Sequence, residues 1–76
     1  MRILVTEYRR DSDFPERETD VTHIGLQAAA ELVDIPVDRF ADVYPLSEKQ
    51  LEALRKLTRE TFDPDGHEYF IEAVEG

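Results

Sequence analysis

Apolar and polar residues alternate most regularly near the two ends of the chain, and this alternation predicts a β-strand at each. The first strand is expected at 3–8, where β-branched and aromatic residues predominate. The second is expected at 68–74, after a turn at 63–66. In that turn Pro64 fixes φ and Gly66 permits a positive φ, so the chain can reverse before the strand begins.

Side chains of the strand at 68–74 alternate between two faces of the sheet. One face receives Tyr69, Ile71 and Ala73. The other receives Glu68, Phe70, Glu72 and Val74. An aromatic side chain between two carboxylates indicates either a face covered by a helix of the same chain or a surface that meets a partner. The sequence leaves both alternatives open.

A hairpin and a first helix are expected after the first strand. A loop rich in turn formers leads into a second strand at about 17–21. A helix should follow at about 23–33, with Asp20 or Thr22 as its N-cap. Gly25 weakens this helix by about 1 kcal/mol relative to alanine.

A short third strand is expected beyond the first helix. Pro36 disfavours helical backbone in the residue before it, so the helix should not continue past that point. Alternation over 39–44 then predicts a strand that carries Asp42 and Tyr44 and ends at Pro45.

The second helix has the clearest start signal in the chain. Ser47 and Gln50 match the Ser-x-x-Gln capping box, in which each residue satisfies a backbone N–H of the other. Leu51, Leu54 and Leu57 then define an apolar face, which a domain of this length needs for its own core.

These elements predict the fold class. Their order is strand, strand, helix, strand, helix, strand, without a repeat or a linker, so residues 1–76 should form a single domain. We expect an α+β fold, with two helices packed on one face of a small antiparallel sheet of three or four strands.

Composition narrows the possible partners. The chain has 18 acidic and 9 basic residues, giving a net charge of −9 that repels nucleic acid and anionic membranes and attracts basic proteins. It has no cysteine, so neither a disulfide nor a thiolate metal site is expected. No apolar run is long enough for a signal peptide or a membrane span, so a cytoplasmic location is expected.

Catalytic and metal sites have little support in the sequence. The carboxylates at 63–68 are spaced like the start of a calcium loop, but an EF-hand would need glutamate where Val74 stands, which favours an ordinary acidic turn. His23 and His67 are the only side chains that titrate near neutrality, and neither has a nucleophile in its sequence context. We therefore expect no enzyme, no cofactor and no metal, although His67 could contact a partner.

Acidic residues on strands favour a partner-binding surface. Asp42, Glu68 and Glu72 each fall in a predicted strand and lie near an aromatic residue, either Tyr44 or Phe70. Interfaces commonly surround an aromatic anchor with polar groups, and charge opposite to that of the partner accelerates encounter. The alternative is that Phe70 belongs to the core and its acidic neighbours are simply solvated.

The chain end carries a family resemblance. Asp63 followed by Glu68-Tyr69-Phe70-Ile71 resembles the C-terminal strand of cloacin-type immunity proteins, the small acidic antitoxins of ribonuclease bacteriocins. The order of elements is similar upstream, including a segment like Asp34-Ile35-Pro36-Val37. Tyr44-Pro45-Leu46 with Gln50 and Leu54 also looks like a pattern of short uncharacterised bacterial proteins. The chain departs from the immunity family in having no tryptophan or cysteine and a fully capped second helix.

The resemblance implies an immunity protein that neutralises a basic toxin, such as a ribonuclease bacteriocin or a polymorphic toxin domain. The implied contact surface is a sheet face carrying Asp42, Tyr44, Glu68, Phe70 and Glu72. Such an inhibitor needs no catalytic residue. The alternatives are an acidic nucleic-acid-mimicking inhibitor of phage origin and an adaptor subunit of an unrelated complex.

Overall fold

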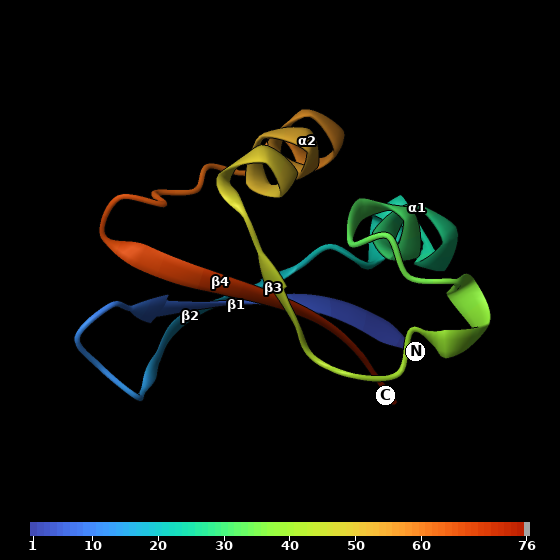
Figure 1. Cartoon of the computed structure of the whole chain (residues 1–76), viewed down its shortest axis with the longest axis horizontal. Coiled ribbons are helices and arrows are strands. Elements are labelled where there is room, and N and C mark those ends of the chain that lie inside the picture. Colours follow the sequence, from blue (N-terminus) through green and yellow to red (C-terminus); the bar gives the residue numbers. More distant parts are fainter. Residues whose placement is uncertain (76) are drawn as a thin grey trace.

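The computed structural model describes residues 1–75, and its centre is a four-stranded antiparallel sheet with both α-helices on one side (Figure 1). The strand order is β2-β1-β4-β3. The predicted α+β fold is therefore confirmed. The elements, in chain order, are β1 (Arg2–Arg9), β2 (Pro15–Asp20), η1 (Thr22–Ile24), α1 (Leu26–Leu32), η2 (Val37–Arg39), β3 (Tyr44–Leu46), α2 (Glu48–Thr58) and β4 (His67–Val74).

The two strands with the clearest alternation pair at the centre of the sheet. Val5 of β1 lies opposite Ile71 of β4, and both side chains are almost fully buried beneath the helices. Because side chains alternate along a strand, this register gives the sheet one continuous apolar face. The buried core consists of Ile3, Val5, Val21, Ala29, Ala30, Phe40, Leu46, Leu51, Leu54, Tyr69 and Ile71.

The predicted capping box of α2 is confirmed. Ser47 Oγ accepts from the Gln50 backbone N–H at 3.2 Å, and Gln50 Oε1 accepts from the Ser47 N–H at 2.8 Å. Leu51 and Leu54 are buried, but the prediction for Leu57 is wrong, since it is 51% exposed. At 100° per residue, the side chain of Leu57, six positions after Leu51, points about 120° away from that of Leu51. Leucines spaced strictly three residues apart therefore do not all face the core.

The predicted first helix is interrupted at Gly25. Its φ of 87° and ψ of 154° separate the 3₁₀ turn η1 from α1, and this backbone conformation is accessible almost only to glycine. The predicted cap is also wrong, because no side chain caps either element. Asp20 Oδ1 instead accepts from the Thr22 backbone N–H at 2.9 Å and from its hydroxyl, which fixes the exit from β2.

The third strand lies further along the chain than predicted. Residues 37–39 form the 3₁₀ turn η2, and β3 comprises Tyr44–Leu46 with Pro45 inside it. Asp42 lies in the preceding loop, where its carboxylate accepts from the Val43 backbone N–H at 2.8 Å. Such local hydrogen bonding by aspartate competes with strand pairing. Proline is tolerated in β3 because that strand is at the edge of the sheet.

Candidate functional site

One face of the sheet has no helix over it within residues 1–75. Both α-helices cover the face that carries Tyr69 and Ile71, as Figure 1 shows. The opposite face carries Thr6 and Tyr8 from β1 and Glu68, Phe70 and Glu72 from β4. This settles which face the helices of the chain occupy and leaves Phe70 outside the core cluster.

A hollow of about 510 Å³ lies on this open face. Tyr8 and Phe70 form its aromatic part, with ring centroids 5.7 Å apart and planes at 88°, the edge-to-face geometry that aromatic pairs prefer. Three carboxylates also line the hollow, namely Asp13, Glu68 and Glu72, and no lysine or arginine does. The hollow therefore combines an apolar contact area with negative charge.

Little basic charge within residues 1–75 offsets these carboxylates. Arg10 approaches Glu68 at 4.0 Å, but its guanidinium is mainly occupied by the backbone carbonyls of Pro64 at 2.7 Å and Asp65 at 3.3 Å. Over the same residues, neither Asp13 nor Glu72 has an ion-pair partner within 4.0 Å. The negative charge of the hollow is thus available to a ligand.

The five residues predicted to bind a partner do not lie on one face. Glu68, Phe70 and Glu72 lie together on the open face, as their alternation predicts. Tyr44 pairs with Ile71 and so faces the helices, with its ring 5.2 Å from that of Phe40 and its hydroxyl donating to the Arg39 carbonyl. Asp42 lies outside any strand. The prediction of a single face carrying all five is therefore wrong, because Asp42 precedes β3 and the register of β3 on β4 turns Tyr44 toward the helices.

Several residues of the open face were not singled out in the sequence. Tyr8 and Asp13 line the hollow together with Val43, which is 49% exposed, and Phe14 beside them is 80% exposed. The alternation of β1 places Tyr8 opposite the buried positions, so it was accessible to the same reasoning as Phe70. Phe14 had a weaker signal, that of an aromatic residue in a polar turn.

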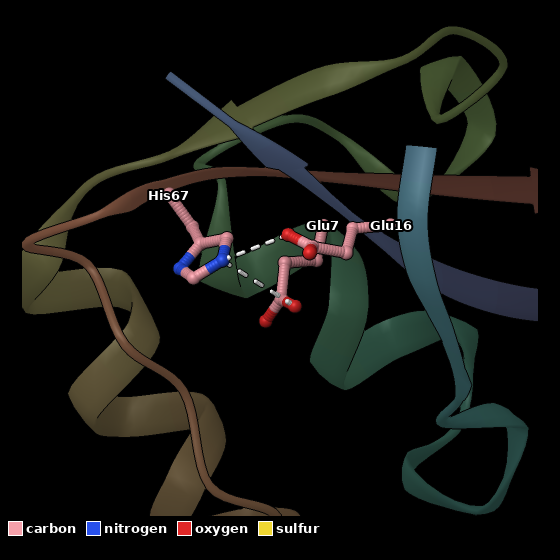
Figure 2. A group of neighbouring side chains, drawn as sticks. All are labelled: Glu7, Glu16 and His67. Atoms are coloured by element: carbon pink, nitrogen blue, oxygen red, sulfur yellow. Dashed lines mark hydrogen bonds and ion pairs between the residues drawn. The ribbon is translucent and has the colours of Figure 1, made fainter. Parts of the chain in front are cut away.

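A second group of polar side chains lies on the covered face, near the end of the sheet where β1 turns into β2. Figure 2 shows His67 of β4 pointing toward Glu7 of β1 and Glu16 of β2. His67 Nε2 lies 3.0 Å from Glu16 Oε2 and 3.9 Å from Glu7 Oε1. The side chains of His67 and Glu7 are 21% and 13% exposed, whereas that of Glu16 is 43% exposed. Three strands thus bring together one imidazole and two carboxylates.

Neighbouring groups orient this cluster. His67 Nδ1 lies 3.2 Å from the Asp63 carbonyl oxygen. The Tyr69 hydroxyl donates to the Glu7 carboxylate and accepts from the Asp63 backbone N–H at 2.7 Å. Burial, together with Glu7, raises the pKa of Tyr69 to about 12, so the phenol keeps the proton that it donates. Burial alone would lower the pKa of His67, but the Asp63 carbonyl and the carboxylates of Glu16 and Glu7 raise it above its ordinary value.

One position in the sequence points to the cluster. Glu7 follows Ile3 and Val5 on the covered face, where a third apolar residue would be expected. A carboxylate at such a position requires a partner. Nothing local identified that partner, because Glu16 and His67 reach Glu7 only through strand pairing.

The fold and the open face define this chain as a small α+β domain with an acidic, aromatic sheet surface. Residues 2–72 match a family described as a domain of unknown function, DUF7683, and the chain belongs to that family. No curated protein and no solved structure matches the chain. The resemblance to cloacin-type immunity proteins therefore remains a prediction. Within residues 1–75, no helix has both the length and the apolar character needed to cross a bilayer.

Proposed function

We propose that this chain is a bacterial immunity protein that binds a basic toxin in the cytoplasm and neutralises it through the open sheet face. The observation that carries the proposal is the hollow on that face, which has two aromatic rings, three carboxylates and no basic side chain. The proposed toxin is a ribonuclease bacteriocin or a related polymorphic toxin domain.

Electrostatics support a basic partner. A nuclease that holds phosphates presents lysine and arginine side chains. Their positive electrostatic field attracts an inhibitor with a net charge of −9 as it attracts the nucleic acid. An arginine or lysine of the toxin would fit the hollow, with its cation over the ring of Phe70 or Tyr8 and near Glu68 and Glu72. Phe14, which follows Asp13 in the chain and is exposed, offers a further apolar contact.

The edges of the sheet are poor docking sites by comparison. The edge strand β2 has the sequence Pro-Glu-Arg-Glu-Thr-Asp, and charged residues on an edge oppose the addition of another strand. The other edge, β3, is only three residues long and contains Pro45, which has no N–H to donate. The face is therefore the more favourable contact surface.

The test uses a double substitution on the face and a matched control on a helix. The toxin would be the basic protein that copurifies with the tagged chain from its host, or the basic C-terminal domain of a large protein encoded beside it. Phe70→Ala with Glu72→Lys should weaken binding by about 3 kcal/mol, more than a hundredfold. Glu31→Lys on α1 adds one positive charge in place of one negative charge, away from the open face, and should change the affinity much less.

Calorimetry would give the affinities, and a nuclease assay would report neutralisation. Circular dichroism should show that the double variant is folded. A folded double variant that binds as tightly as the wild type would overturn the proposal, as would equal losses in the double variant and Glu31→Lys. The association rate should also fall steeply with added salt, and an association rate insensitive to salt would count against charge complementarity.

A further inference from the structure

The cluster of Glu7, Glu16 and His67 places one imidazole nitrogen against two carboxylates. His67 Nδ1 lies 3.2 Å from the Asp63 carbonyl, which can only accept, so Nδ1 carries a hydrogen. The other nitrogen, Nε2, then holds either a second proton or a free lone pair. A lone pair would face two carboxylate oxygens at 3.0 Å and 3.9 Å, which is repulsive. A proton on Nε2 relieves this repulsion, and a metal ion bound between the three side chains would do the same.

The separations of these atoms suit a metal ion. Imidazole and carboxylate ligands lie about 2.0–2.2 Å from Zn²⁺, so two ligand atoms of a tetrahedral site are about 3.3–3.6 Å apart. The distances from Nε2, 3.0 Å to Glu16 and 3.9 Å to Glu7, lie about 0.3 Å below and above this range. The ligand atoms of all three residues lie within 4.8 Å of one another. Small rotations of the Glu7 and Glu16 side chains would bring both carboxylates to tetrahedral separations.

We propose that Glu7, Glu16 and His67 bind one divalent transition-metal ion, with Zn²⁺ as the best match. One imidazole and two carboxylates are ligand types found at zinc sites, and a fourth position would remain for water. Mg²⁺ and Ca²⁺ prefer oxygen ligands alone and suit an imidazole poorly. The proposal goes beyond the open face and does not depend on a toxin partner.

The surroundings of the cluster supply the outer contacts that metal ligands usually have. Histidine ligands commonly donate their second N–H to a carbonyl, as His67 does to Asp63. Glu7 accepts from the Tyr69 hydroxyl, which holds its carboxylate in place. The three ligands come from β1, β2 and β4, so the ion would cross-link strands that are distant in the sequence.

The test is calorimetric titration of the whole chain with ZnCl₂ near neutral pH. We expect one bound ion per chain and release of a proton by the fraction of His67 that is protonated. His67→Gln and Glu16→Gln should each weaken binding at least tenfold, and Tyr69→Phe should weaken it about tenfold through loss of the contact to Glu7. His23→Gln is the matched control, because His23 lies exposed on η1, and it should bind Zn²⁺ as the wild type does.

Competition separates this site from general attraction of cations to an acidic protein. Excess MgCl₂ should leave Zn²⁺ binding nearly unchanged. The proposal is overturned if the wild type does not bind Zn²⁺, if His67→Gln and Glu16→Gln both bind as tightly as the wild type, or if Mg²⁺ displaces the ion readily. Circular dichroism checks folding, and Glu16→Gln alters an exposed side chain, so it keeps the test valid should His67→Gln unfold.

Discussion

Two leucines of α2 allow a sharp test of how the helix packs on the sheet. Leu54 is 0% exposed and Leu57 is 51% exposed, although they are the same residue type in the same helix. Truncation of a buried leucine to alanine removes its transfer free energy and leaves a cavity, which together cost about 2–5 kcal/mol. Truncation of the half-exposed Leu57 creates no enclosed cavity, so it should cost less than about 1 kcal/mol.

These losses are large relative to the whole domain. A chain of 76 residues is expected to have a free energy of unfolding of roughly 4–11 kcal/mol. A loss of about 3 kcal/mol in Leu54→Ala would lower the melting temperature by roughly 12–24 °C. Leu57→Ala should lower it by only a few degrees, since its loss of free energy is below about 1 kcal/mol.

Urea unfolding followed by circular dichroism measures both free energies. The slope of the free energy against urea concentration should be the same in both variants, since the surface exposed on unfolding hardly changes. Equal destabilisation by Leu54→Ala and Leu57→Ala would refute the orientation of α2. A larger loss in Leu57→Ala would show that a different helix face meets the sheet.

Three further outcomes are expected. Gly25→Ala should destabilise the domain by about 1–3 kcal/mol in urea unfolding, despite the higher helix propensity of alanine, because the φ of 87° is strained for any other residue; a gain in stability would contradict this. Ser47→Ala should cost about 1 kcal/mol by removing the cap of α2, with Ser12→Ala in the hairpin loop as a comparison expected to cost less. Because the pKa of His67 is raised in the folded state, its stabilising contribution should be complete below about pH 6.5 and disappear as the pH rises through the raised value. Unfolding measured with a chelator present should show this fall in the wild type and not in His67→Gln, and parallel profiles would argue against the His67 contacts.

Local signals in the sequence were sufficient for β1, β4 and α2. Strand alternation placed Ile71 and Phe70 on opposite faces, and the Ser47 capping box located the start of α2. These features depend on residues close together in the chain. The fold class followed from the order of such elements.

The remaining errors concern features that depend on competing or distant interactions. At Gly25 the helical periodicity continues through a residue whose backbone conformation breaks the helix. The hydrogen bond of the Asp42 side chain competes with strand pairing, so the third strand begins only at Tyr44, whose ring packs on that of Phe40. The contact of Glu16 with His67 depends on strand register and on a register shift beside Glu7, which no local pattern encodes.

The pairing of β1 with β4 also determines when the domain can fold during synthesis. Arg2 pairs with Val74, so the two central strands are the first and the last of the four strands of this sheet in chain order. Until β4 is made, the hairpin of β1 and β2 has no other strand to pair with, and isolated two-stranded hairpins are marginally stable. The chain should therefore remain largely unfolded on the ribosome until β4 has emerged. Its folding should then be slower than that of a helical domain of equal length, because the central contacts close the longest loop in the chain.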